Sequence, residues 1–336
     1  MNVMDCLSAS HQATNKAQHY LLLFKIVTAW IAAIVPIAFW RFKGLGWLGH
    51  KHTQIYFAIH MLWSIELPLT YSFVYLYDYL RISIKKDDPC DYLISTSFSM
   101  NTRILPVVGL VGEIITMFVI CIERALSTIR PVHYERFRNN NAAFLVCFIS
   151  VIASFGLTYG ILFFNIKWDA YLTTYTLKTP ENANRFQLMT IAEVIIEVSA
   201  VVIFMVSLIR NNQQHKLFMK THAIVLANKY QIKENRKVLK NLLPLCILHG
   251  FLLTVNSFGL SIYPLIFPKF DPIDHAFYLE CIGQVHLYSI IGPIILTYGV
   301  LRKKRNVVNK IQHHDEYFVN LKNHFEKGRD TTIFCE

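Results

Sequence analysis

The chain has 336 residues, of which 54% are hydrophobic and 16% charged, and its formal net charge is +11. Soluble domains usually carry about 25% charged residues, so this composition excludes an ordinary soluble enzyme. It also excludes a nucleic-acid-binding domain, because the basic residues flank apolar stretches and do not gather in one soluble segment.

Seven apolar stretches follow one another along the chain. A hydrocarbon core of about 30 Å requires roughly 20 residues of helix, and each stretch is long enough. The predicted spans are 20–40, 54–79, 99–124, 142–164, 187–209, 241–266 and 276–300. The sequence therefore predicts an all-α membrane protein, a seven-transmembrane helix bundle over residues 20–300.

Lys and Arg are distributed unequally between the segments that connect these spans. If the N-terminus lies outside the cell, the inner segments together with Arg124 contain 23 Lys and Arg, whereas the outer segments contain eight. Basic residues are enriched in cytoplasmic loops. We therefore expect an extracellular N-terminus, 1–19, and a cytoplasmic tail, 301–336.

The third span ends in Cys121-Ile122-Glu123-Arg124-Ala125. An acidic residue beside Arg at this point is typical of the switch at the inner end of the third helix in G-protein-coupled receptors. While such a charge pair is intact it closes the bundle, and its release frees the Arg for a partner. Glu123 and Arg124 are therefore candidates for a G-protein coupling switch. The alternative is an interfacial ion pair without a function.

Several short stretches resemble one family of receptors. They are Asp88-Pro89-Cys90-Asp91, Arg103, Glu123-Arg124, Tyr134-Glu135 and Lys229-Tyr230-Gln231-Ile232-Lys233-Glu234-Asn235 before Leu242-Leu243-Pro244-Leu245. They resemble the nematode serpentine chemoreceptors of the Sra superfamily, most closely the alpha/beta class (Srab). The resemblance implies a multi-pass receptor in the plasma membrane of sensory cilia on chemosensory neurons. Such a receptor binds a small environmental chemical and activates a heterotrimeric G protein.

Other classes of membrane protein fit less well. His60, His249 and His286 lie in three different spans and lack paired metal-ligand spacing, so we expect no metal site, no cofactor and no enzyme activity. A transporter is expected to show an internal repeat, and we find none. A seven-helix ligand-gated ion channel subunit or a transporter remains the alternative function.

Charged and polar residues within the spans suggest a ligand pocket, because such residues usually face the bundle or water. Glu193 and Glu197 are four residues apart and therefore share one face of the fifth span. The acids outnumber Lys25 and Arg103, which favours a cationic or hydrogen-bond-donating ligand; the alternative is internal pairing, for example Arg103 with Glu280. The candidate ligand-binding residues, on the third, fifth, sixth and seventh spans, are Glu113, Glu193, Glu197, Asn256, Glu280 and His286.

The seven cysteines include only three that can reach the oxidising side, namely Cys6, Cys90 and Cys281. The family resemblance places one Cys before the first span and one in the loop before the third. It therefore implies a Cys6–Cys90 disulfide, with Cys90–Cys281 as the second possibility.

The distribution of charge predicts how epitope tags will label. A tag placed before Met1 should be detected on intact cells, and a tag placed after Glu336 should be detected only after permeabilisation, because basic loops are retained in the cytoplasm. Tagging both ends of the same protein provides the control for expression. The reverse labelling pattern would contradict the receptor orientation.

Overall fold

The computed structural model describes the chain over residues 3–48, 50–130, 134, 140–173, 176–220, 226–266, 277–278 and 280–298, with the backbone alone over 218–220, 226–231 and 260–266. The chain forms two compact units, Met1–Pro293 and Ile294–Glu336. The helices α1 to α8 all belong to the first unit. The expected cytoplasmic tail, 301–336, lies outside the described residues.

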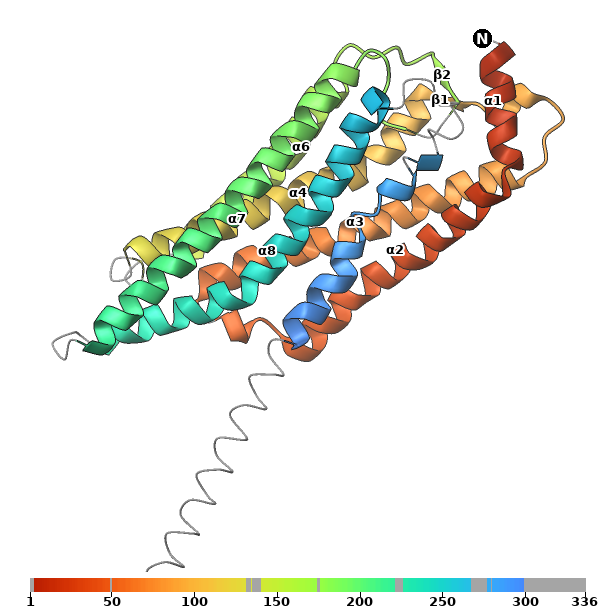
Figure 1. Ribbon diagram of the computed structural model, residues 1–336. Coiled ribbons are helices and arrows are strands. Elements are labelled where there is room, and N and C mark those ends of the chain that lie inside the picture. The colour runs from red at the N-terminus through yellow and green to blue at the C-terminus, as the bar shows by residue number, and fades with distance from the viewer. Residues whose placement is uncertain are drawn as a thin grey trace, which may run out of the picture. The chain divides into compact units, whose positions relative to one another are not determined.

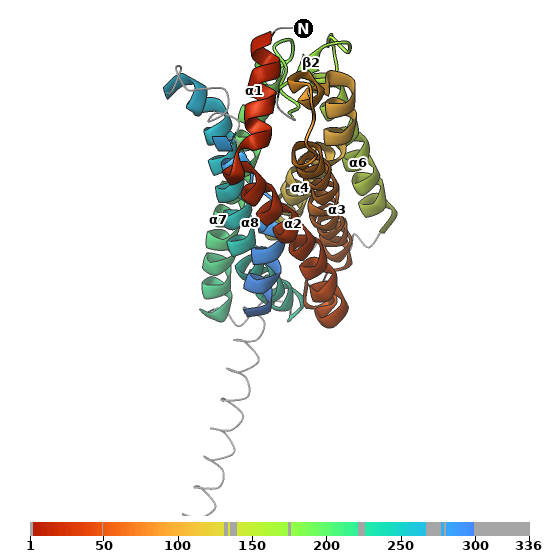
Figure 2. The same cartoon turned by 90° about the vertical axis from the view of Figure 1, so that its right-hand side faces the viewer.

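Helices account for nearly all of the first unit (Figures 1 and 2). The α-helices are α1 (Val3–Thr14), α2 (Lys16–Lys43), α3 (Lys51–Ser83), α4 (Thr96–Ile129), α6 (Asn140–Leu162), α7 (Ala183–Lys220) and α8 (Leu226–Ile266), and the 3₁₀ helices are η1 (Gly46–Leu48) and η2 (Pro89–Tyr92). Two short strands, β1 (Ile94–Ser95) and β2 (Tyr171–Leu172), pair antiparallel, with Ile94 opposite Leu172. Figures 1 and 2 show α1 and the strands at one end of the bundle.

Six helices of the described chain are long and apolar enough to cross a membrane. Five of them belong to α2, α4, α6, α7 and α8, and the sixth is Glu280–Tyr298. The remaining predicted span, 54–79, lies within α3, which has 33 residues and is therefore also long enough. Tyr, His and Glu side chains interrupt the apolar sequence of α3. The architecture is that of a serpentine bundle with helices in the seven predicted places.

Most of the helices extend beyond the predicted spans. α4 continues past Arg124 to Ile129, and α7 continues past 209 to Lys220. Hydropathy marks only the part of a helix that lies in hydrocarbon, whereas backbone hydrogen bonding continues into the polar interface. The chain is therefore helical on both sides of the Glu123-Arg124 pair.

Local sequence determines where two of the helices begin. The Asn15 side chain accepts a hydrogen bond from the backbone N–H of Ala17 at 2.9 Å, and Ser95 accepts one from Phe98 at 3.3 Å. These are N-caps, which satisfy backbone donors that have no partner inside the helix. Asn15 thus ends the α1 segment and starts α2.

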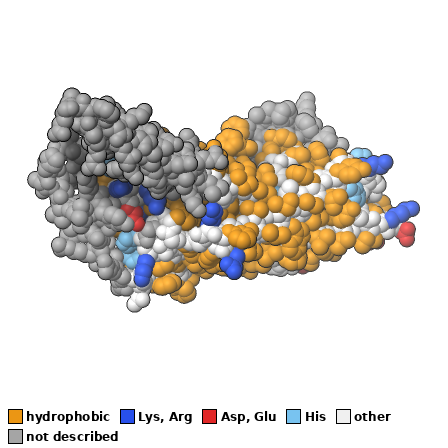
Figure 3. Space-filling model, turned by 90° about the horizontal axis from the view of Figure 1, so that it is seen from below, with side chains coloured by type: hydrophobic (Ala, Val, Ile, Leu, Met, Phe, Trp, Pro, Cys, Tyr) orange, Lys and Arg blue, Asp and Glu red, His pale blue; other side chains and the backbone are white. Residues whose placement is uncertain are grey.

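The bundle exposes many large apolar side chains, and its interior contains charged and polar side chains as well as apolar ones. Large hydrophobic side chains of α6, such as Phe144, Phe148 and Ile152, are exposed, and Figure 3 shows a face covered mainly by hydrophobic side chains. Lys25 and Glu197, by contrast, are buried. Exposed apolar surface together with buried charges is unusual for a soluble domain and fits a protein whose solvent is lipid.

α3 and α4 approach each other closely because of two glycines on α4. A Cβ atom at Gly112 would lie 2.4 Å from Cε2 of Trp63, and a Cβ atom at Gly109 would lie 3.3 Å from the backbone of Leu67. Small residues permit this kind of close helix contact in membranes. The contact holds the second and third spans against each other.

A disulfide ties α1 to the bundle by joining Cys6 to Cys90, the pairing that the family resemblance implies. Ala9 and Ala13 of α1 are buried in a cluster that also contains Tyr92 of η2. The segment before the first span is therefore a helix fixed over one end of the bundle.

Cys6→Ser should destabilise the folded protein by about 2–4 kcal/mol, because removing the link increases the freedom of the unfolded chain. The expected result is a lower temperature of thermal unfolding in detergent. Cys281→Ser is the matched control, because Cys281 is free and exposed. Equal unfolding temperatures for the two variants would contradict a stabilising role for the link.

Candidate functional site

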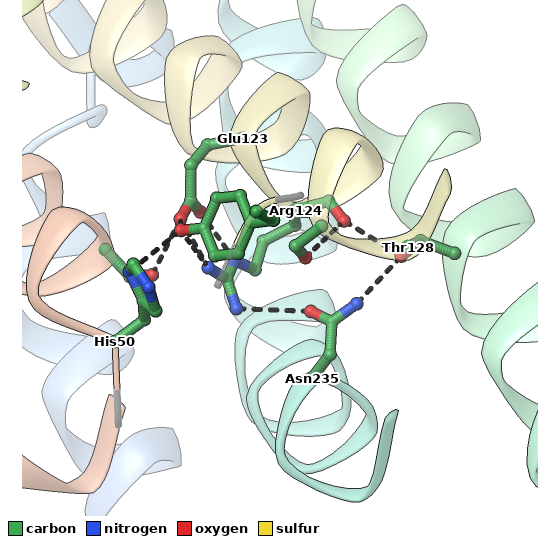
Figure 4. Close-up of polar contacts among 8 residues, drawn as sticks. His50, Glu123, Arg124, Thr128 and Asn235 are labelled. Carbon is green, nitrogen blue, oxygen red and sulfur yellow. Dashed lines mark hydrogen bonds and ion pairs between the residues drawn. The ribbon is translucent and has the colours of Figure 1, made fainter. Parts of the chain in front are cut away.

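The C-terminal end of α4 carries a buried ion pair (Figure 4). The Nε atom of Arg124 donates to Oε2 of Glu123 at 2.5 Å, and Nη2 donates to Oε1. Arg124 is 2% exposed and Glu123 6% exposed. Bidentate Arg–carboxylate pairs are among the stronger hydrogen-bonded interactions in proteins, and here the pair also neutralises two charges away from water.

Asn235 connects this pair to α8. Its Oδ1 accepts a hydrogen bond from Nη1 of Arg124 at 3.1 Å, and its Nδ2 donates to Oγ1 of Thr128 at 2.8 Å. Asn211 of α7 donates to the same hydroxyl at 2.7 Å. The C-terminal part of α7 and the N-terminal part of α8 are thereby held to α4 by side chains on two successive turns.

Tyr134 and Thr53 complete the network on the other side. The Tyr134 hydroxyl accepts from Nη2 of Arg124 at 2.9 Å and donates to Glu123. It also lies 3.0 Å from Nδ1 of His50, and Thr53 of α3 donates to Oε1 of Glu123 at 3.0 Å. Burial, and then the Glu123 carboxylate, raise the pKa of Tyr134, so its hydroxyl remains a donor at physiological pH.

The opposite end of the bundle, where α1 lies, contains a cavity of about 140 Å³. Three of the six expected ligand-binding residues line it, namely Glu193, Asn256 and Glu280. The other polar or aromatic side chains in its wall are Gln12, Gln18, Lys25, Tyr71, Tyr75, Asp78, Arg103, Thr176, Phe186 and Thr190. The cavity was expected between the third, fifth, sixth and seventh spans, but α1, α2 and α3 contribute to it as well.

Glu280 is held by two cations in this wall. It forms an ion pair with Nζ of Lys25, and Nη2 of Arg103 lies 3.4 Å from its Oε1. The internal pairing considered for Arg103 and Glu280 is therefore present. Lys25 also lies over the ring of Tyr75, 4.7 Å from its centroid. This triad joins α2 and α4 to residue 280 and orients all three charges.

Glu113 and Glu197 do not line the cavity but flank a buried histidine below it. Nδ1 of His249 lies 2.9 Å from Oε1 of Glu197, and Nε2 lies 3.5 Å from Oε2 of Glu113. Glu197 is one helical turn, about 6 Å, further along α7 than Glu193, which separates it from the cavity. The cluster links the third, fifth and sixth spans.

His286, the remaining expected ligand-binding residue, is also outside the cavity wall. Its Nε2 lies 2.9 Å from Oγ1 of Thr28 on α2. His60 makes a similar link between spans, because its Nε2 lies 2.7 Å from the hydroxyl of Tyr288 and its Nδ1 lies 3.1 Å from Oγ1 of Thr116. Polar contacts inside the bundle therefore continue from the cavity toward the network around Arg124.

Sequence reasoning assigned no role to four residues that the structure places in these sites: Tyr134, Asn235, His249 and Lys25. For Tyr134 and Asn235 a signal existed, since both belong to the motifs that carry the family resemblance. Lys25 is the one charged residue within the first predicted span, and buried charges in membranes are usually paired. Nothing in the sequence indicated that Glu113 and Glu197 would contact His249.

Comparisons with known proteins agree with the geometry. Residues 3–327 match the profile of the family described as "Serpentine type 7TM GPCR receptor class ab chemoreceptor". A relative from Caenorhabditis elegans, "Serpentine receptor class alpha/beta-14", is 21% identical over 305 residues, which cover 87% of this chain and 76% of the relative.

Asn235→Ala should lower the stability of the folded protein by about 1–3 kcal/mol, because it leaves a donor of Arg124 without its acceptor in a buried site. Thermal unfolding of the purified protein measures the change. Lys233→Ala, two residues away and exposed, is the control and should change stability by less than about 0.5 kcal/mol. If Asn235→Ala unfolds at the temperature of the control, the contact does not stabilise the bundle.

Proposed function

Because the chain belongs to the serpentine receptor class ab family of chemoreceptors, we propose that it is a chemosensory G-protein-coupled receptor. It is a multi-pass membrane protein, and we place it in the plasma membrane of sensory cilia with its N-terminus outside and its C-terminus inside. Its ligand is a small environmental chemical, and its cytoplasmic partner is a heterotrimeric G protein.

The observation that carries this proposal is the network around Arg124. One guanidinium contacts its helical neighbour Glu123, Asn235 of α8 and Tyr134. Separating α3, α4 and α8 at their inner ends would break these contacts and leave buried polar groups unpaired, which is costly in free energy. Separation of the helices would free Arg124 to bind a segment of the G protein. In our proposal the closed network is the resting state.

The cavity is the proposed ligand site. A ligand can shift the receptor toward the open state only by the difference between its affinities for the two states. The cavity wall contains residues of α2, α3, α4, α7 and α8, so a change in their spacing would change ligand affinity. We propose that Glu193, Asn256 and Glu280 face the ligand directly. Glu113, Glu197 and His286 do not line the cavity, and we propose that they affect ligand binding indirectly.

The buried histidine cluster is the proposed connection between the two ends. His249 contacts Glu197 of α7 and Glu113 of α4, and Arg124 is 11 residues, about 16 Å, further along α4 than Glu113. Movement of α8 relative to α4 would change both the His249 contacts and the Asn235 contact with Arg124. The pair of helices α4 and α8 therefore connects the His249 cluster with the network around Arg124.

Arg124→Ala should abolish the ligand response without removing the protein from the cell surface. The measurement is a calcium or cAMP response in cells that express the full chain and a matching Gα subunit, screened with small volatile and water-soluble compounds. Arg130→Ala is the control, because Arg130 is an exposed arginine at the end of the same helix and should leave the response unchanged.

Two outcomes would contradict the proposal. A full response from surface-expressed Arg124→Ala would refute the role of the switch. A response that persists in cells lacking Gα subunits would refute G-protein coupling and would favour a ligand-gated channel.

A further inference from the structure

Four of the five charged side chains in the cavity wall take part in ion pairs between described residues. Glu280 is paired with Lys25 and Arg103. Asp78 accepts hydrogen bonds from Nε and Nη2 of Arg81, at 2.9 and 2.6 Å. Glu193 is the remaining charged residue that lines the cavity, and none of the ion pairs of the described residues includes it.

Glu193 is also deeply buried. It is 6% exposed, and its Oε1 atom has no hydrogen-bond partner among the described residues. Leaving a carboxylate in such a place is costly unless a cation or donor accompanies it. The other two acids of the cavity wall, Asp78 and Glu280, have cationic partners, whereas none of the ion pairs among the described residues supplies one for Glu193.

The surroundings of Glu193 limit what the partner can be. Asn256 adds a second polar group to the wall, and Val107, Phe186 and Met189 add apolar surface. The cavity volume, about 140 Å³, is close to that of an engineered protein cavity of about 150 Å³ that binds benzene. A ligand of this size can carry one small apolar group and one polar group.

We propose that this cavity recognises a small compound with a protonated amine that pairs with Glu193, and that its apolar part packs against Val107, Phe186 and Met189. This inference rests on the proposed function, since it names the ligand class of the same site. An anionic ligand fits less well, because it would compete with Glu280 for Lys25 and Arg103. Glu280 is part of the chain and is therefore always present beside the two cations. The triad thus acts as a fixed part of the wall, and Glu193 acts as the recognition group.

The proposal can be tested by binding alone. The full chain, purified and placed in lipid nanodiscs, is titrated with benzylamine, benzyl alcohol and benzoate, and with the amine, alcohol and carboxylate based on cyclohexane. Stabilisation against thermal unfolding reports binding. The amines should bind at least tenfold more tightly than the matched alcohols, and the carboxylates should bind more weakly than both.

Glu193→Gln should remove the tenfold preference for the amine, because the amide has the same shape without the charge. Glu181→Gln is the control: it makes the same change in an acid that does not line the cavity, and it should keep the preference. The proposal is overturned if amines bind no better than alcohols in the unmodified protein, if no amine binds, or if Glu193→Gln keeps the preference. Because no G protein is present, failure of coupling cannot be mistaken for failure of amine recognition.

Discussion

The pairing of buried charges inside an apolar shell is the constraint on which the rest of this structure depends. The hydrocarbon core of a bilayer cannot hydrogen-bond to a charged group, so charges inside the bundle usually pair with other groups of the protein or face a water-filled cavity. Arg124 and Glu123 meet this requirement together, but the five donors of the guanidinium exceed what one carboxylate accepts. Asn235 and Tyr134 accept the additional hydrogen bonds, and this draws other elements toward α4.

The same requirement is met at two further levels, by the Lys25–Glu280–Arg103 triad and by His249 between Glu113 and Glu197. Every level includes a residue of α4, which is the most buried of the candidate spans. Close packing against α3 at Gly112 adds a direct contact between these two helices. A displacement at one level is therefore expected to reach the others through helices that share these contacts. The physical basis of such coupling is a set of packed elements with two discrete arrangements.

The polar residues of the interior differ in how completely they are satisfied. Glu280 has two cationic partners, whereas Glu193 retains a buried oxygen without a hydrogen-bond partner in the described chain. Fully satisfied groups hold helices together, and incompletely satisfied ones mark places where a ligand or water can add to the structure. Glu113 and Glu197 also retain a buried oxygen without a partner, but both contact His249. Among these acids, Glu193 is therefore distinguished by its absence from the ion pairs of the described residues, although in the sequence all are glutamates within apolar spans.

The sequence by itself determined the class and the order of the helices, because hydropathy is a local property and roughly 20 residues suffice to show it. It also indicated the importance of Glu123 and Arg124, whose position at the end of a span is visible in one dimension. Only the tertiary structure decided which acid pairs with which cation. Glu193 and Glu197 share a helix face, yet one lines the cavity and the other contacts His249. That outcome depends on the rotation and depth of helices that lie far apart in the sequence, for which local patterns carry no information.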